Sequence, residues 1–487
     1  MKKNPENSFP IISIESFGGT EGLVTGSCHR LSIKNSLILV DYGLFQGRDE
    51  KSHNGGINRN SEPVKDIANG VTDVLETHVH IDHSGRLPLI FKKGFTPRIL
   101  ATKETAIFME PMLYNSAKIQ ENEKSSQKLY GTRDVDKTLS HLKIIKPFEL
   151  IPIGQKHDRV TAEFLLNGHV MGSSSIVIRE HGGKKNILFT GDMGKPNQSL
   201  CGGYTNFVDQ YPNDPINVMV VESTSFDKDP VSFEEKRKGL LAAINEVWEG
   251  KGNPVIPALS FHRTPEIMEM LHNCQENGDL PEDCQIIIDA PLAMELLDTF
   301  KKELGSNCLS NGYGDDPEFY KTIENSINRF NLKNVTIIKE HKESVAFSKK
   351  AANSKERLII IASGGMGGHG RSVNYTRGEF GNNPRNAVVQ TCFQVPGTEG
   401  AKLLEKGRVT NGKNKGARVV KIEGFTSHIS GSDQTFGFLE RFNLSNLEKV
   451  IITHGKDKAR ITMANDFKRR GYGAEIILSK IHQIIEI

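Results

Sequence analysis

Short apolar runs separated by glycine-rich turns dominate the first half of the chain. The runs are rich in Val, Ile and Leu and are four to seven residues long, which is typical of β-strands. We therefore expect strands at residues 11–14, 37–40, 71–77, 186–189 and 218–221. A helix is expected over about residues 103–128, and this helix is polar toward its C-terminal end.

The pattern changes from about residue 227 onward. Longer helical stretches at residues 232–249 and 264–277 alternate there with apolar runs, at 255–256, 285–288 and 358–361. Strands that alternate with crossover helices indicate a parallel sheet. Because 487 residues are too many for one simple core, the change of pattern predicts a second domain.

Composition limits the classes of partner. The formal net charge is only +3, so contact with a nucleic acid would need a local basic surface. The six cysteines are scattered and form no Cys-x-x-Cys pair, so we expect reduced thiols and a cytoplasmic protein. The chain lacks a run of about 18 apolar residues, so we expect no membrane partner.

Residues 78–83 read His-Val-His-Ile-Asp-His, which places four potential metal ligands within six positions. On extended backbone His78 and His80 point to the same side, and Asp82 and His83 follow where the chain turns. Imidazole and carboxylate groups together suit zinc or a similar transition metal. A polar loop that is merely rich in histidine is the alternative, but four ligands in six residues favour a metal site.

Two further residues complete a set of ligands for two metal ions. His169 lies in Asn-Gly-His-Val-Met-Gly, a turn flanked by glycines, and Asp192 follows the apolar run Leu-Phe-Thr-Gly. A carboxylate at a strand end can bridge two cations that are about 3.5–4 Å apart. Each residue alone has an ordinary role as a capping or turn residue. Their order after the His-x-His-x-Asp-His block favours the metal site.

Several motifs, in this order, resemble those of the β-CASP branch of the metallo-β-lactamase superfamily. Within that branch the chain is similar to prokaryotic homologues of the endonuclease subunit of the pre-mRNA cleavage and polyadenylation specificity factor. The motifs extend from about residue 15 to residue 460 and include GGTEGLVTGSCHRL (18–31), LVDYGLFQGR (39–48), THVHIDHSGRLP (77–88), GHVMGSSS (168–175), FTGDMG (189–194), VVEST (220–224), GFTSHISGSDQ (424–434) and ITHGK (452–456).

The resemblance implies an α/β fold with a discontinuous first domain. Residues 1–226 and 423–487 would form an αββα metallo-β-lactamase sandwich. Residues 227–422 would form the inserted β-CASP domain, an α/β unit with a mostly parallel sheet.

The resemblance also implies a role for each matching residue. His78, His80 and His169 would hold one zinc ion, and Asp82, His83 and His454 would hold a second. Asp192 would bridge the two ions, and Asp41 would orient a ligand histidine. The predicted catalytic residues are Asp82, His428 as general acid for the leaving oxygen, and Glu222 as the partner of His428.

The function implied is a zinc-dependent ribonuclease that hydrolyses phosphodiester bonds with a hydroxide activated by two metal ions. Endonucleolytic cleavage is expected, with 5′-exonucleolytic action and a homodimer left open. In this family a histidine at the position of His454 goes with RNA substrates, so single-stranded RNA is the expected partner. The alternatives are a catalytically silent RNA-binding scaffold and a metallo-hydrolase that acts on DNA or on a small-molecule ester.

Phosphate contacts are predicted at a glycine-rich loop. Ser363, Gly364 and Gly365 begin this loop, and its backbone N–H groups are expected to hold a phosphate, with Arg371 close by. The chain departs from the family pattern at Gly364, where serine is usual, at Pro265 and at Lys456, where glutamate is usual. These departures leave hydrolysis credible and leave substrate preference open.

Overall fold

The computed structural model describes residues 12–51, 58–122, 128–182, 185–196, 198, 201, 203–204, 211–305, 328–411 and 414–487. The chain divides into two compact units. The first unit combines residues 1–229 with residues 427–487, and the second comprises residues 230–426. Segments far apart in the sequence therefore build the first unit.

Two sheets form the centre of the first unit. The first sheet has the order β21 (Ile484–Glu486), β1 (Ile12–Gly18), β2 (Cys28–Ile33), β3 (Ser36–Val40), β4 (Val71–Leu75), β5 (Arg98–Thr102) and β6 (Leu142–Ile145). The second has the order β20 (Glu475–Leu478), β19 (Lys449–Thr453), β11 (Val218–Glu222), β10 (Lys185–Phe189), β9 (Ser174–Glu180), β8 (Val160–Leu166) and β7 (Ile151–Ile153). Strands β3 to β6 run parallel, as do β10, β11, β19 and β20.

One continuous apolar core lies between these two sheets. Each strand contributes every second residue, because successive side chains of a strand point to opposite faces. The first sheet provides Ile14, Leu31 and Ile38, and the second provides Ile178 and Phe189 among others, all buried. Alternate residues of the apolar runs therefore form the interior of a sandwich.

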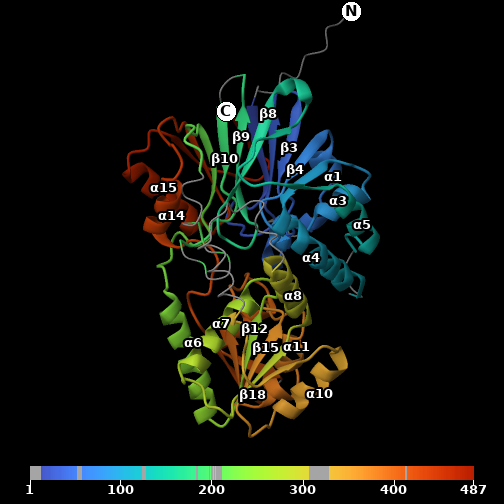
Figure 1. Ribbon diagram of the computed structural model, residues 1–487, viewed down its shortest axis with the longest axis vertical. Coiled ribbons are helices and arrows are strands. Elements are labelled where there is room, and N and C mark those ends of the chain that lie inside the picture. Colours follow the sequence, from blue (N-terminus) through green and yellow to red (C-terminus); the bar gives the residue numbers. More distant parts are fainter. Residues whose placement is uncertain are drawn as a thin grey trace, which may run out of the picture. The chain divides into compact units, whose positions relative to one another are not determined.

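Helices cover the outer faces of the sandwich, which gives the predicted αββα order (Figure 1). On the side of the first sheet lie α1 (Val64–Ala68), α3 (Leu87–Lys92), α4 (Lys103–Asn122) and α5 (Thr132–Ser140). On the side of the second sheet lie α14 (Gly431–Leu439) and α15 (Asp457–Arg469). The expected helix over 103–128 is confirmed to Asn122, and residues 123–127 lie outside the described residues.

The second unit is an α/β domain around one sheet. The strands have the order β14 (Val335–Ile337), β13 (Gln285–Asp289), β15 (Leu358–Ser363), β12 (Pro254–Ala258), β16 (Ala387–Gln390), β18 (Asn414–Lys421) and β17 (Arg408–Asn411). All neighbouring pairs are parallel except β17 with β18. The mostly parallel sheet that the sequence predicted is confirmed.

The helices of the second unit begin where the sequence indicates. Helix α6 (Phe233–Glu249) starts after Ser232, whose hydroxyl accepts the N–H of Glu235 in a capping box. Pro265 is the third residue of α7 (Arg263–Glu276), where its missing N–H costs no helical hydrogen bond. The other helices are α8 (Pro291–Gly305), α10 (His341–Ala351), α11 (Ser372–Thr376), α12 (Glu379–Asn382) and α13 (Glu399–Lys406).

A helix must be long and apolar to cross a membrane. Over the part of the chain that the structure describes, no helix combines the length and the apolar character needed to cross a bilayer.

Candidate metal centre

The predicted ligands, together with Asp41 and Glu222, lie at or after the carboxyl ends of strands in the first unit. Asp41 follows β3, and His78 and His80 follow β4, while Asp82 and His83 lie in the short helix α2 (Ile81–Ser84). In the second sheet His169 follows β8, Asp192 follows β10, Glu222 ends β11 and His454 follows β19. Because neighbouring parallel strands end at the same edge of a sheet, these residues come together there.

Backbone hydrogen bonds hold helix α2 in place. The Tyr42 N–H donates to the carbonyl of His83 (2.7 Å), and the Ser27 N–H donates to the carbonyl of Asp82 (2.9 Å). Between these two bonds, the N–H of Gly43 donates to the carbonyl of Ser27 (2.8 Å). Two ligands of the candidate site are thus anchored by the main chain of two earlier loops.

Gly43 allows this close approach, because an added Cβ there would lie 1.6 Å from the carbonyl oxygen of Asp82. We expect Gly43→Ala to displace α2 and to lower the free energy of unfolding by about 3 kcal/mol, as overpacking does. Chemical denaturation and metal content would measure this. Gly473→Ala is the matched control, since a Cβ at Gly473 meets nothing within 4 Å. Equal stability of the two variants would contradict the prediction.

Four side chains form the first group with ligand spacing: His78, His80, His169 and Asp192. Nδ1 of His80 lies 3.0 Å from Nε2 of His78 and 3.3 Å from Nε2 of His169. Oδ2 of Asp192 lies 3.6 Å from Nε2 of His78 and 3.7 Å from Nε2 of His169. Tetrahedral ligands about 2.0–2.1 Å from a zinc ion lie roughly 3.3 Å from one another, so the group fits one ion.

A second group consists of Asp82, His83 and His454. Nε2 of His83 lies 3.2 Å from Nε2 of His454 and 3.3 Å from Oδ2 of Asp192. Oδ2 of Asp82 lies 3.8 Å from Nε2 of His454. Asp192 is therefore within reach of both groups, as a bridging carboxylate must be.

The protonation states of His80 and Asp192 favour the binding of a metal cation. Burial lowers the pKa of His80 to about 4, so its imidazole is neutral and available as a ligand at neutral pH. Burial opposes charge on Asp192, but His454, His83 and His428 together hold its pKa well below the ordinary value. Oδ1 of Asp192 accepts no hydrogen bond from any described residue. A buried, ionised carboxylate with an unused oxygen fits a divalent cation.

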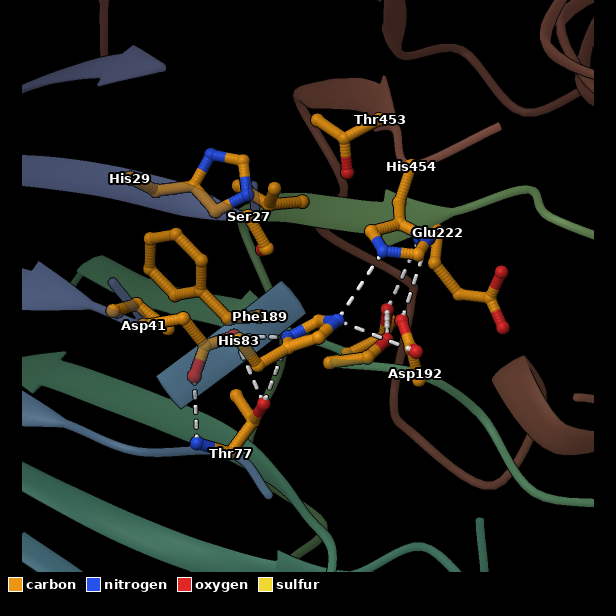
Figure 2. A pocket seen from close by; sticks show the side chains of 14 residues that line it. Ser27, His29, Asp41, Thr77, His83, Phe189, Asp192, Glu222, Thr453 and His454 are labelled. Carbon is orange, nitrogen blue, oxygen red and sulfur yellow. Dashed lines mark hydrogen bonds and ion pairs between the residues drawn. The ribbon is translucent and has the colours of Figure 1, made fainter. Parts of the chain in front are cut away.

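Asp41 and Thr77 contact the Nδ1 edges of ligand rings, and Figure 2 shows these contacts at His83. Oδ2 of Asp41 lies 2.7 Å from Nδ1 of His83, which turns Nε2 of that ring toward Asp192 and His454. The hydroxyl of Thr77 donates to Oδ2 of Asp41 (2.9 Å) and lies 3.1 Å from Nδ1 of His78. Such partners hold a ligand ring in one orientation and one tautomer.

His428 and Glu222 form a pair at the same site. Nδ1 of His428 lies 3.1 Å from Oε1 of Glu222, and Nε2 lies 3.7 Å from Oδ2 of Asp192. Oε1 of Glu222 also accepts the N–H of Met193 (3.0 Å), which holds the carboxylate in position. The side chain of His428 is 17% exposed, whereas that of Glu222 is 3% exposed, so the imidazole is the more accessible member of the pair.

The glycine-rich loop predicted to contact phosphate lies in the second unit, and part of it is engaged internally. The N–H of Gly364 donates to the carbonyl of Ala258 (3.1 Å), and the hydroxyl of Ser363 accepts the N–H of Arg371 (3.3 Å). Gly364 adopts φ +102°, a conformation that suits glycine. The Arg371 guanidinium donates to the carbonyl of Lys339 (2.9 Å). These N–H groups therefore serve the loop itself, and Gly365 packs against Cys392.

Thr77 and Thr224 are site residues that the sequence reasoning missed. The hydroxyl of Thr224 lies 2.8 Å from Nδ1 of His454. In the sequence, only their positions could have indicated this role: Thr77 directly precedes His78, and Thr224 lies two residues after Glu222. Of the other histidines, His29 is buried beside Ser16, and burial lowers its pKa to about 3.

Comparisons with known proteins identify the domains of the chain and its relatives. The model of the metallo-beta-lactamase superfamily matches residues 22–230, and the model of the Beta-Casp domain matches residues 264–403. A ribonuclease of Thermus thermophilus is 24% identical over 454 residues, which cover 92% of this chain and 94% of the relative. An RNase of Saccharolobus solfataricus is 26% identical over 476 residues, which cover 96% of this chain and 84% of the relative.

Two further similarities extend the comparison. The transcription termination factor FttA of Methanosarcina mazei is 25% identical over 483 residues, with 94% of this chain and 69% of that protein covered. A crystal structure of a protein of unknown function from Enterococcus faecalis has the same fold, with a TM-score of 0.54 and 14% identity over 98% of this chain and 100% of that one. The chain therefore belongs to the β-CASP branch of the metallo-β-lactamase superfamily and is a metal-dependent hydrolase.

Proposed function

We propose that the chain is a zinc-dependent ribonuclease that cleaves single-stranded RNA, with a centre for two ions. The observation that carries the proposal is the pair of ligand groups that share Asp192. The names of the relatives, two ribonucleases among them, support RNA as the substrate. A silent scaffold is disfavoured, because each predicted ligand is present and lies within ligand spacing.

Two bound divalent ions would supply Lewis-acid stabilisation of phosphate charge and a water of lowered pKa. His78, His80, His169 and Asp192 would hold one ion, and Asp82, His83, His454 and Asp192 the other. The chain must then provide a proton where the leaving 3′-oxygen departs. In the proposed step the oxygen of a water that has released one proton to solvent forms a bond to phosphorus, and the P–O3′ bond breaks. Nε2–H of His428 donates its proton to O3′, and the ring then regains a proton from solvent.

Glu222 supports this role of His428. Its carboxylate accepts a hydrogen bond from Nδ1, so Nδ1 keeps a proton and the second proton of the charged ring is on Nε2. We assign Glu222 as the positioning partner of the general acid.

Contact with the RNA backbone and the cellular compartment are also part of the proposal. Arg371 and the loop at Ser363, Gly364 and Gly365 are the proposed phosphate contacts, with the positive charge of Arg371 as the main contribution. The five described cysteines are buried and none is in a disulfide, which supports a reducing compartment such as the cytoplasm.

The test is cleavage of one RNA oligonucleotide by zinc-loaded protein, with the label at its 5′ end or its 3′ end. A DNA oligonucleotide of the same sequence and a p-nitrophenyl ester run beside it. We expect internal RNA fragments and a DNA rate lower by at least about 10-fold. Release of single nucleotides from the 5′ end would indicate exonucleolytic action. Turnover of DNA or of the ester without RNA cleavage would overturn RNA as the substrate.

A further inference from the structure

The three residues at the end of β11 hold two histidines of the metal centre at once. Glu222 contacts Nδ1 of His428, and two residues later the hydroxyl of Thr224 contacts Nδ1 of His454. We propose that Thr224 is a positioning residue for the second metal ion, because it aims Nε2 of His454 at that ion. The inference rests on the two-metal centre of the proposed function.

The hydrogen bonds of Thr224 determine which nitrogen of His454 can bind a metal. The hydroxyl lies 3.0 Å from the carbonyl oxygen of His454 and donates its only hydrogen there. It can then only accept from Nδ1 at 2.8 Å, so Nδ1 carries the ring proton. Nε2 keeps its lone pair and points to the second group, 3.2 Å from Nε2 of His83.

The main chain around His454 explains why a side chain is needed for this purpose. His454 adopts φ +44°, which few residues other than glycine adopt. Its backbone is held by the N–H of Ser223, which donates to its carbonyl (3.0 Å), and by its own N–H, which donates to the carbonyl of Gly19 (2.5 Å). These bonds hold the main chain of His454 in place but contact no atom of its ring. The Thr224 hydroxyl contacts Nδ1 and so helps to fix the orientation of the ring.

The effect of Thr224 is confined to one ion. The hydroxyl of Thr224 contacts His454 of the second group, whereas His78 and His169 of the first group contact the hydroxyls of Thr77 and Ser427. Removing the hydroxyl should therefore lower the affinity for the second ion and leave the affinity for the first ion unchanged. Loss of such a partner typically costs about 10–100-fold in metal affinity.

The experiment is metal titration of the full chain with zinc against a chelator and with Co²⁺ followed by visible absorption. Thr224→Val removes the hydroxyl and keeps the shape, and Thr224→Ser keeps the hydroxyl. Thr462→Val is the matched control, since the hydroxyl of Thr462 donates to the carbonyl of Lys458 on the exposed side of α15. We expect Thr224→Val to bind the second ion about 10–100-fold more weakly, with an altered Co²⁺ spectrum, and Thr224→Ser to behave like the wild type.

Other outcomes would overturn the inference. These are equal affinity for the second ion in Thr224→Val and wild type, loss of both ions together, or a Thr224→Ser variant as weak as Thr224→Val. Binding of a single ion by the wild type would overturn it as well. Two bound ions without RNA cleavage would overturn only the proposed ribonuclease, so the two failures are distinguishable.

Discussion

Asp192→Asn is expected to remove metal from the centre and to lower the rate of RNA cleavage by about 10³-fold or more. A Lewis-acid ion contributes several kcal/mol to a transition state, and about 4 kcal/mol corresponds to 10³ in rate. Asparagine has the same shape as aspartate but lacks the charge and one acceptor oxygen. The substitution therefore tests the charge and not the volume of the side chain.

The position of Asp192 explains why one residue should matter to both ions. Its Oδ2 lies within 3.7 Å of His78, His83 and His169, and its Oδ1 lies 3.6 Å from Nδ1 of His454. The side chain is 2% exposed. In the variant, buried imidazoles would face an amide instead of an anion, so the first ligand group would lose its only carboxylate and the second would keep Asp82 alone.

The measurement is metal content per chain after dialysis, together with cleavage of a labelled RNA. Asp283→Asn is the matched control, because Asp283 is 69% exposed and pairs with Arg357 on the surface. The control should keep both metal and activity. An Asp192→Asn protein with two ions and wild-type cleavage would show that Asp192 does not bridge the ions.

The local part of the site could be predicted from the sequence on chemical grounds. His78, His80, Asp82 and His83 lie within six residues, so no fold was needed to bring them together. The structure places these residues on a strand end and on α2, within ligand spacing of the rest. By contrast, His454 lies 371 positions from His83, and their contact could be expected only from the family resemblance.

The residues behind the ligands could not be predicted, for a physical reason. A threonine at a strand end has many ordinary roles, since its hydroxyl can bond any nearby carbonyl. That Thr77 and Thr224 face imidazole nitrogens depends on the register of β4, β11 and β19. The pairing of Glu222 with Thr453 across β11 and β19 sets that register, and no short motif encodes it.

The glycine-rich loop shows a different limit of sequence reasoning. A run such as 363–370 predicts available N–H groups, because glycines allow the backbone to approach a phosphate. In the structure the N–H of Gly367 donates to the carbonyl of Gly364 (2.9 Å), and an alanine Cβ at Gly364 would lie 2.0 Å from the carbonyl oxygen of His369. Glycine is required at Gly364 by the loop's own packing. Composition alone does not show whether a glycine is needed for approach of a phosphate or for the packing of the loop itself.

His428→Ala is expected to lower kcat for RNA by about 10²–10⁴-fold while both ions stay bound, which is the effect of losing a general acid. His428 belongs to neither predicted ligand group, although its Nε2 lies 3.7 Å from Oδ2 of Asp192. Its ring is held through Nδ1 by Glu222, so Nε2 is the nitrogen that can give up a proton. Its loss should therefore remove a proton donor and leave the ligands in place.

A substrate whose leaving group needs no proton separates this role from a structural one. We expect His428→Ala to cleave bis-(p-nitrophenyl) phosphate within about 10-fold of the wild-type rate, because p-nitrophenolate leaves as an anion. His181→Ala is the matched control, since His181 is exposed and bonds Thr161 far from the ligands. If His428→Ala loses RNA cleavage and ester cleavage equally, or loses an ion, the general-acid role is wrong. A loss confined to RNA would identify the proton that His428 gives to the departing 3′-oxygen.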